Sequence, residues 1–596
     1  MRRSKAVSAV SAIAAAALVL SACGSGGDNG DQNGSSADVK SMATGKSQNG
    51  DNFKLGDAPE SEQVIVAIDQ GYSAYNNKTP DANNSYNNYV MAAVLASPFP
   101  LDGNNKPLLN TDVMESVKVT SQNPQIVEWK IKPGVKWSDG APWDCKDFYL
   151  KWLAASGKAK KSDGEPAFKP ASTTGYELVK QPTCSPDNLT LTAQFDEPYL
   201  DYKGMFADQV LMPAHVLEQK TGIPDITKLT PEGDKGQLAS AGDFWSTQWK
   251  GFKPDIMPGS GPYMITDYDA NSKQVTLSKN PQWIGAKGGP KKVIVKAIPD
   301  TKAMATALQN GEIDVAASTQ PDATAANTMK GLSSQGVIYG SAPQLTFEHL
   351  DLQYNRMFKD PALRKAFFQS IDRQQITDKL LKEVQADAQP LGSLQFFQGE
   401  PGYQDNYANK AGQGAEAAAK TLTDAGWVKG ADGIFAKDGQ RASFTITHNE
   451  NARRDQTVEI IIPLAKAAGL EVKNETDPNF LKGRVDKGEY DVALFAWSAT
   501  PFKAEQKAIY STGGNQNWQG LSDPTVDEAF KKAVSATDET VKQKAYQDAD
   551  KALSEQYASL PLFAVPSMWG FRGIDRVYMQ SYNGALWNVG EWTKTG

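Results

Sequence analysis

The stretch KKVIVKAIPDTKAMATALQNGEIDVAA, residues 291–317, decides the fold class of this chain. It opens with an apolar, β-branched run, continues with a helical segment and closes with a second apolar run. Asp300 and Thr301 precede the helical segment as N-cap residues, and Gly311 follows it as a C-cap glycine. The order strand, helix, strand predicts a βαβ unit and, with it, an α/β fold.

A similar phrase returns later in the chain, as LEVKNETDPNFLKGRVDKGEYDVALFAW at residues 470–497. Both phrases place a glycine, a glutamate and an aspartate directly before an apolar strand, as GEIDVA at 311–316 and GEYDVA at 488–493. We therefore expect strand, helix and strand here as well. Because the phrase returns only once, a solenoid is excluded, and we expect two α/β lobes built on the same local plan.

The rest of the chain also alternates between strand and helix patterns. Period-two runs bounded by glycine or proline predict strands, and capped apolar-periodic runs predict helices. We expect strands at 63–71 and 188–195, a hairpin at 126–140, paired strands within 259–285, and helices at 85–99, 141–156, 359–381, 416–427 and within 524–563.

Length and composition limit the class of protein. A chain of 596 residues exceeds a single hydrophobic core and predicts several domains. The formal net charge is −7, which argues against a nucleic-acid groove, because phosphate binding needs concentrated positive charge. The 13 Trp, 20 Tyr and 22 Phe suit a large core and a cleft that holds a flexible ligand by stacking.

The N-terminus has the pattern of an export signal. Arg2, Arg3 and Lys5 precede a 15-residue apolar segment, which is too short to span a membrane. The sequence LSAC at 20–23 resembles a bacterial lipobox, so we expect residues 1–22 to be a signal peptide and Cys23 to carry a lipid. The alternative is an ordinary secretory signal with a chance cysteine. We expect a lipid-anchored protein on the extracellular face of the cell membrane.

A polar tract follows Cys23. It consists of Gly, Ser, Asn, Asp and Gln with almost no large apolar side chain, so it cannot bury enough area to offset the entropy of ordering. We expect residues 23–60 to be a lipid-anchored flexible linker.

Two cysteines, Cys145 and Cys184, remain after Cys23 is set aside. In an oxidising compartment this even number predicts a disulfide, which would contribute up to ~4 kcal/mol on the chain-entropy model. Two buried free thiols are the alternative.

Patterns for catalysis and metal binding are missing. The three histidines, at 215, 349 and 448, form neither an HExxH pair nor a Cys/His zinc spacing. The chain has no GxSxG elbow and no P-loop. The glycines of GSGP at 259–262 do not cradle a phosphate, because Pro262 lacks an amide donor and no helix follows. We expect no catalytic residue, no metal and no cofactor.

Five motifs, in this order, resemble family 5 of the extracellular solute-binding proteins, the peptide- and nickel-type receptors of ABC importers. They are VKWSDGAPWDCKDFYLKW at 135–152, GSGPYMITDYDANSKQVTLSKNPQW at 259–283, ALQNGEIDVA at 307–316, LRKAFFQSIDRQQI at 363–376 and AAAKTLTDAGW at 417–427. Ser260 replaces the threonine of the family's Gly-Thr-Gly-Pro-Tyr segment. The resemblance covers roughly residues 62–592, and its Gram-positive members are lipid-anchored, which would explain Cys23.

The resemblance implies an α/β, type II periplasmic-binding-protein-like fold, with two lobes, a hinge and an inserted extra domain. The hinge is expected where the chain crosses between lobes, near 343–350 and 556–562. The implied boundaries are domain I at 61–98, 252–342 and 556–596, domain II at 99–251, and domain III at 343–555.

The implied function is a lipid-anchored receptor that captures an oligopeptide or peptide-like solute and delivers it to an ABC permease and its ATPase. Such a receptor works as a monomer, binds no nucleic acid and is no enzyme. The alternative is a cell-envelope lipoprotein with the same fold that regulates glycolipid synthesis through a protein partner.

A candidate ligand site follows the strand DVALFAW at 491–497, because ligands of α/β lobes lie beyond the carboxyl ends of strands. Peptide receptors of the family resemble Trp-x-Ala-Asp here, and the aspartate pairs with the ammonium of the peptide. Thr500 occupies that position and carries no charge, so the ligand could be a blocked peptide, a glycan or a glycolipid fragment, or Glu505 could supply the acid.

The expected ligand-binding residues come from three segments. Each also has a simpler interpretation: Trp497 could pack in the core, Trp518 could close a turn, and the three residues near 85 could cap a helix. The set is Asn84, Tyr86, Asn87, Trp497, Ser498, Thr500, Asn517 and Trp518.

Overall fold

The computed structural model describes residues 52–102, 106–207, 209–514 and 516–595. The predicted signal peptide, Cys23 and most of the predicted linker lie outside these residues. In the part of the chain that is described, none of the helices has both the length and the apolar character needed to cross a bilayer.

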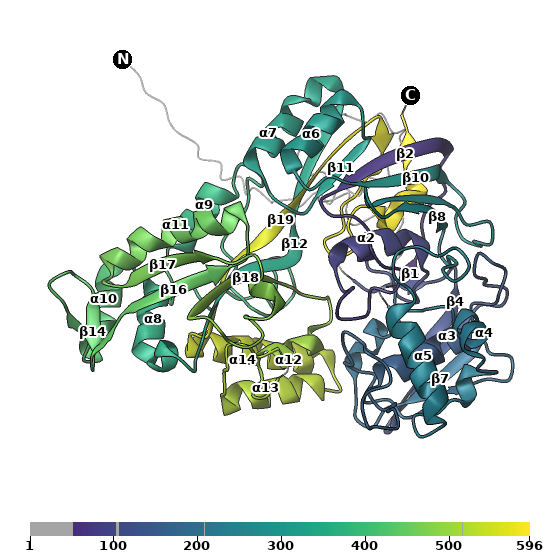
Figure 1. Ribbon diagram of the computed structural model, residues 1–596, viewed down its shortest axis with the longest axis horizontal. Helices are drawn as coiled ribbons and strands as arrows, with labels where there is room; N and C mark the ends of the chain where they lie inside the picture. The colour runs from purple at the N-terminus through teal and green to yellow at the C-terminus, as the bar shows by residue number, and fades with distance from the viewer. Residues whose placement is uncertain (1–51, 103–105, 208, 515, 596) are drawn as a thin grey trace, which may run out of the picture.

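A ten-stranded sheet runs through both halves of the molecule (Figure 1). Its strand order is β17-β16-β18-β12-β19-β11-β2-β10-β9-β8. The two longest strands, β12 (Val337–Leu352) and β19 (Ser559–Arg572), pair antiparallel at its centre. Both continue from one half into the other, so they connect two lobes that share one sheet.

The first lobe contains the expected βαβ unit. Strand β2 (Glu60–Ile68) lies between β10 (Gly289–Ala297) and β11 (Val315–Ser318) and is parallel to both. Helix α6 (Thr301–Asn310) connects β10 to β11. The Asp300 side chain accepts from Ala303 N at its start, and Gly311 ends it with a φ of 75°. Asp300 and Gly311 are confirmed as caps, and Thr301, expected with Asp300 before the helix, is its first residue.

The second lobe repeats this arrangement with one difference. Strand β16 (Ser443–His448) lies between β17 (Glu471–Thr476) and β18 (Val492–Ser498), again parallel to both. The helix predicted between β17 and β18 is wrong, because only a short 3₁₀ turn, η5 (Phe480–Lys482), forms there. The buried Phe480, Val485 and Tyr490 recur every five residues, a spacing that does not make one face of an α-helix.

The repeated aspartate has the same role in both lobes. Asp314 Oδ2 accepts from Ile65 N of β2 at 2.7 Å, and Asp491 Oδ2 accepts from Thr445 N of β16 at 3.2 Å. Each carboxylate thus holds an amide of the central strand of its own lobe. The phrase shared by residues 311–316 and 488–493 is therefore a structural device that joins adjacent strands.

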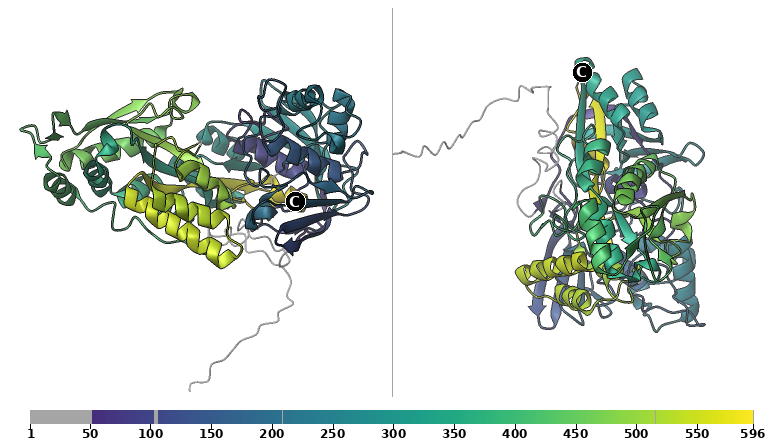
Figure 2. Two further views of the ribbon diagram at one scale, coloured as in Figure 1. Left: turned by 90° about the horizontal axis from the view of Figure 1, so that it is seen from below. Right: turned by 90° about the vertical axis from the view of Figure 1, so that its left-hand side faces the viewer.

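The remaining elements cover the sheet or extend its edge. In the second lobe, α13 (Pro524–Val534) and α14 (Glu539–Gln556) lie side by side on one face (Figure 2). The others are α2 (Ser85–Val94), β8 (Tyr263–Asp269), β9 (Gln274–Lys279), α7 (Ala323–Gly331), α8 (Pro361–Ser370), α9 (Arg373–Leu380), α10 (Ala415–Asp424), β13 (Val428–Lys429), β14 (Phe435–Lys437), β15 (Gln440–Arg441), α11 (Ala452–Ala467), α12 (Gln506–Tyr510), β20 (Ile574–Asp575) and β21 (Thr593–Lys594).

A separate antiparallel sheet lies within the predicted domain II, with the order β4-β5-β7-β6. Its elements are β4 (Met114–Gln122), β5 (Gln125–Ile131), α3 (Cys145–Ala155), β6 (Thr183–Cys184), β7 (Thr190–Gln194), η1 (Leu200–Gly204), α4 (Ala214–Thr221) and α5 (Lys235–Thr247). We call these elements the inserted domain. They lie below the first lobe in Figure 1.

The hairpin predicted at 126–140 is wrong. Strand β5 pairs with β4 and β7, and the chain then leaves the sheet. Pro133 offers no amide to a ladder, and Gly134 has a φ of 85°, so the strand cannot continue through them. A smaller turn follows at Asp139 and Gly140, where Trp137 N donates to Ala141 O at 2.9 Å.

The predicted linker also ends earlier than residue 60. Strand β1 (Asn52–Phe53) pairs parallel with β3 (Leu109–Asn110), and Phe53 and Leu55 are buried in a small apolar cluster with Trp587. Two apolar side chains in an otherwise polar tract are enough to hold this segment against the body of the protein.

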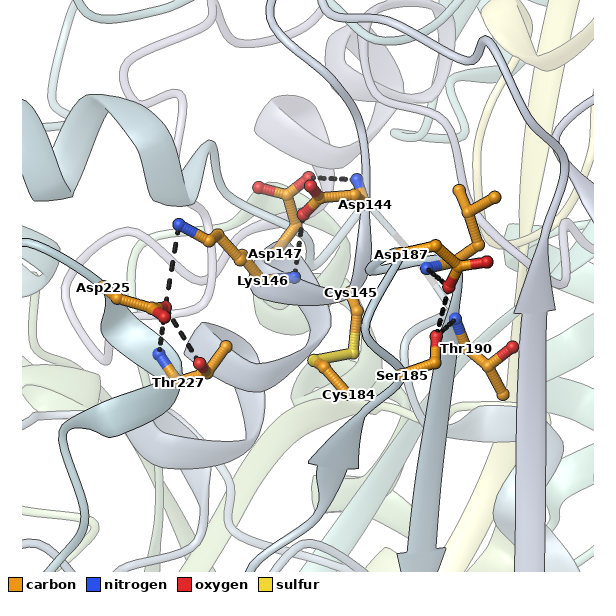
Figure 3. Close-up of a disulfide and its surroundings, with 11 residues drawn as sticks. Asp144, Cys145, Lys146, Asp147, Cys184, Ser185, Asp187, Thr190, Asp225 and Thr227 are labelled. Carbon is orange, nitrogen blue, oxygen red and sulfur yellow. Dashed lines mark hydrogen bonds and ion pairs between the residues drawn. A yellow bond between two sulfur atoms is a disulfide. The ribbon is translucent and has the colours of Figure 1, made fainter.

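Cys145 and Cys184, the two cysteines that could pair, are joined in a disulfide with their Cα atoms 5.8 Å apart (Figure 3). Cys145 begins α3 and Cys184 lies in β6, so the bond ties the start of the helix to the edge of the sheet. The same helix start carries a capping box, in which Asp144 accepts from Lys146 N at 2.9 Å and Asp147 accepts from Asp144 N at 3.1 Å.

Replacing both Cys145 and Cys184 by alanine will lower the unfolding free energy of the inserted domain by up to ~4 kcal/mol, because the unfolded chain gains loop entropy. Denaturant titration monitored by tryptophan fluorescence measures the change. Dithiothreitol should lower the midpoint of the wild type and leave the double variant unchanged. Equal midpoints for the two proteins would show that the bond contributes nothing.

Candidate functional site

A cavity of about 740 Å³ lies where the two lobes and the inserted domain meet. The first lobe contributes residues between 77 and 88, the inserted domain residues between 151 and 210, and the second lobe residues between 497 and 516. Asn, Ser, Thr and Tyr side chains make up much of its wall. This volume is typical of small-molecule and cofactor sites, and the lining suits a ligand with many polar groups.

Five of the expected ligand-binding residues line this cavity: Asn84, Tyr86, Trp497, Ser498 and Thr500. They come from the start of α2 and the end of β18, which are far apart in the sequence. Asn84 is also the N-cap of α2, and its Oδ1 accepts from Asn87 N at 3.0 Å. The capping interpretation and the position at the cavity therefore both apply to Asn84.

Three expected residues do not line the cavity. Asn87 is fully buried, and its Oδ1 accepts from Ser73 N at 2.7 Å. Asn517 closes the turn at 517–521, since its Nδ2 donates to Leu521 O at 2.7 Å. Trp518 packs on Trp497 with ring centroids 4.9 Å apart, so it supports the cavity wall from behind.

Trp497 belongs to an aromatic cluster at the end of β18. Its ring centroid lies 5.2 Å from that of Phe495 and 6.3 Å from that of His349, whose ring is stacked on it. The indole is half-buried and also lines the cavity. Trp497 therefore both packs in an aromatic cluster and lines the cavity, because the cluster holds its indole ring in the cavity wall.

Thr500 offers no charge to the cavity and uses its hydroxyl locally. Its Oγ1 donates to Phe502 O at 2.8 Å and accepts from Phe502 N at 3.2 Å, which closes a tight turn. Glu505 lines the same cavity and is the acid nearest to this segment in sequence.

A buried carboxylate joins the end of β2 to the end of β11 in the first lobe. Asp69, directly after β2, accepts from Ser318 Oγ at 2.5 Å and from Thr319 N at 2.6 Å. Burial raises the pKa of Asp69, although these hydrogen bonds oppose the shift. Thr319 Oγ1 shares a hydrogen bond of 3.0 Å with the hydroxyl of Tyr86, so Asp69 positions a residue of the cavity wall.

Sequence reasoning missed the part of the wall that the inserted domain supplies. Lys151 of α3 lines the cavity at 4% exposure, and its Nζ lies 4.8 Å from the ring centroid of Tyr176. Burial lowers the pKa of Lys151 to about 7; Lys78 lowers it further and Glu505 opposes the shift. The available signal was a lysine inside the run FYLKWLAA, where every other side chain is apolar.

The inserted domain and the second lobe touch beside the cavity. Asp201 Oδ1 of η1 lies 2.7 Å from Lys542 Nζ of α14, and both side chains are mostly buried. Gly204 lies so close to the Phe502 ring that a Cβ at this position would be 2.8 Å from it. These contacts close the cavity on this side.

Histidine and carboxylate positions give no metal centre in the described residues, where His, Cys, Asp and Glu form no group of three or more that could hold an ion. His215 pairs with Asp139 at 2.9 Å, His448 with Asn474 at 2.9 Å, and His349 is buried on β12.

Comparisons with known proteins agree with this architecture. Residues 109–519 match the model of the bacterial extracellular solute-binding proteins, family 5 (middle). The oligopeptide-binding protein OppA of Mycobacterium tuberculosis is 26% identical over 547 residues, which cover 89% of this chain and 83% of OppA. An uncharacterized lipoprotein of Mycobacterium leprae is 23% identical over 556 residues, 89% of this chain and 93% of that protein.

The fold matches that of the periplasmic EDTA-binding protein EppA with a TM-score of 0.81 at 24% identity, over 91% of this chain and 98% of that one. The α/β fold expected from the resemblance is therefore confirmed.

Gly204→Ala will loosen the contact between the inserted domain and the second lobe, because the new methyl group meets the Phe502 ring. The backbone of Gly204 tolerates alanine, since its φ lies outside the left-handed region. Spin labels at Lys220→Cys and Lys531→Cys, both exposed, should report a longer and broader distance distribution. Gly331→Ala, where a Cβ meets nothing, is the control. An unchanged distribution would show that the contact between Gly204 and Phe502 does not hold the inserted domain against the second lobe.

Lys151→Met will stabilise the protein most at low pH. Burial lowers the pKa of Lys151 to about 7 in the folded protein, whereas the exposed lysine of the unfolded chain has a pKa of 10.5. Between pH 7 and pH 10.5 the unfolded chain therefore binds more protons than the folded protein, and the stability of the wild type rises with pH. The advantage of the variant should therefore narrow by about 3 kcal/mol between pH 6 and pH 9.5. Denaturant melts of both proteins at each pH test this, and parallel curves would contradict it.

Proposed function

This chain belongs to the bacterial extracellular solute-binding proteins of family 5, which bind solutes and are not enzymes, and from that premise we propose that it captures a peptide-like solute and delivers it to an ABC permease. The solute occupies the cavity between the lobes. The lobes close around it by rotation at the two strands that connect them.

The cavity between the lobes is the observation that carries the proposal. Its wall combines hydrogen-bonding side chains, among them Asn84 and Ser498, with the aromatic rings of Tyr86 and Trp497. Such a wall can satisfy the amide groups of an extended backbone and cover its side chains by stacking. The named OppA relative supports a peptide-like solute, and the EDTA-binding neighbour supports a carboxylate-bearing one.

The uncharged Thr500 sets the kind of peptide we propose. A hydroxyl engaged with Phe502 supplies no counter-charge for a free peptide ammonium. The solute is therefore a peptide whose amino end is blocked or lies elsewhere in the cavity.

The anchoring proposal rests on the N-terminal sequence. A lipid on Cys23 holds the protein at the extracellular face of the cell membrane, and the polar tract that follows lets the receptor reach its permease. The lipoprotein relative supports this arrangement. We propose that the receptor acts as a monomer.

A thermal-shift screen tests the proposal. Protein lacking residues 1–23 retains every described residue and is mixed with pools of free peptides, N-acetylated peptides and envelope oligosaccharides. A ligand at 100 times its Kd adds ~2.7 kcal/mol of stability. We expect the acetylated peptides to shift the melting temperature most. A shift with oligosaccharides alone would overturn the peptide proposal, and no shift in any pool would favour the glycolipid-regulating lipoprotein.

Trp497→Ala will weaken solute binding by more than about tenfold while the protein stays folded, because a stacking surface at the end of β18 is lost. Isothermal titration with the peptide pool found by the screen measures this. Trp497→Phe keeps an aromatic ring and should recover most of the affinity. If Trp497→Ala binds as tightly as the wild type, the proposed position of the solute is wrong.

A further inference from the structure

A buried lysine with no counter-ion at bonding distance lines the cavity. Among the residues that the structure describes, Nζ of Lys151 makes no hydrogen bond and no ion pair, and its recorded contact is the Tyr176 ring at 4.8 Å. Lys151 is 4% exposed. An ammonium group at such a position is costly unless an anion compensates it. The protein itself does not provide that anion at bonding distance.

The charged residues that line the cavity also favour an anionic group near Lys151. Its charged lining residues are Lys78, Lys151 and Glu505, so positive charge exceeds negative charge. Glu505 has interactions of its own, and Thr500 is neutral and hydrogen-bonded to Phe502. The cavity therefore favours a solute that brings a negative group to Lys151.

A carboxylate fits this environment better than a phosphate. One ammonium balances one negative charge, whereas a phosphate carries up to two and is typically held by the forked donors of arginine. No arginine is among the described residues that line the cavity. Ser172, Thr173 and Thr174, from the same wall, offer further hydroxyl groups of the kind that hydrogen-bond a carboxylate oxygen.

We propose that the ammonium group of Lys151 binds a carboxylate of the solute and selects carboxylate-bearing ligands. This inference rests on the proposed function, because it concerns the same cavity, and it assigns the part of the solute that the inserted domain recognises.

Proton uptake should accompany this contact. Burial, with a further contribution from Lys78, lowers the pKa of Lys151 to about 7, and a bound carboxylate favours the charged ammonium. Lys78 and Glu505 act on Lys151 electrostatically from other segments, and the ring of Tyr176 lies against its Nζ. Above pH 7 the free protein must take up a proton to bind the carboxylate, so affinity falls with rising pH.

The test compares matched probes on matched variants. The probes are N-acetylated tri- to octapeptides with a free C-terminal carboxylate, the same peptides as C-terminal amides, citrate and inorganic phosphate. The proteins are the wild type, Lys151→Met, which keeps the length of the side chain and the helix, and Lys160→Met, which removes a positive charge from an exposed position outside the cavity lining. Titration calorimetry measures each affinity.

We expect the wild type to bind the carboxylate peptides at least about 30-fold more tightly than the amides. Lys151→Met should lose that preference, and Lys160→Met should keep it. Wild-type affinity for the carboxylate peptides should fall close to tenfold per pH unit between pH 7.5 and 9, and the affinity of Lys151→Met should not.

The other outcomes separate this inference from the proposed function. Peptides that bind equally well as carboxylates and amides would overturn the role of Lys151 and leave peptide capture intact. Citrate binding that requires Lys151, without any peptide binding, would support the carboxylate contact and overturn the peptide proposal. Phosphate binding that requires Lys151, without citrate binding, would overturn the choice of carboxylate. Binding of no probe would overturn both proposals.

Discussion

The antiparallel pairing of β12 with β19 is the constraint on which the rest of the structure depends. Residues 337–343 of β12 pair with residues 566–572 of β19 beside the first lobe, and residues 347–351 pair with residues 559–564 beside the second. The register shifts between Pro343 and Phe347 and again between Glu348 and His349. Each lobe adds its parallel strands to this central ladder, so the two carboxyl edges that line the cavity are placed by one pair of strands.

Much of the lobe architecture could be predicted because it is local. The caps Asp300 and Gly311 define α6 from neighbouring residues alone, and the alternation of strands and helices fixes the fold class. For the segment between β17 and β18 the same reasoning predicted a helix that does not form. Its glycine and aspartate copy those of the first lobe, but Phe480, Val485 and Tyr490 bury themselves around a short turn, and that choice depends on the surface they meet.

The candidate site was predictable at the end of β18 and, in part, at the start of α2, where Asn84 and Tyr86 line the cavity. Trp497, Ser498 and Thr500 come from the end of β18, and a rule about strand ends finds them. Lys151 and Tyr176 reach the same cavity from the inserted domain, whose position over the lobes is tertiary. Asn87 and Asn517 have the polar character of ligand-binding residues, but their side chains hydrogen-bond to nearby backbone groups instead. A prediction from residue type alone therefore includes too many ligand-binding residues, because local hydrogen bonds compete for the same side chains.

Two strands, rather than one, connect the lobes, and this has a kinematic consequence. A single connecting segment would leave each lobe free to twist, tilt and slide relative to the other. A hydrogen-bonded pair resists shear and sliding, so we expect bending of the paired strands near the register shifts of β12 to be the easiest relative motion of the lobes. Opening and closing would then reduce to one rotation, and an opening that moves the inserted domain away from the second lobe has to break the ion pair between Asp201 and Lys542.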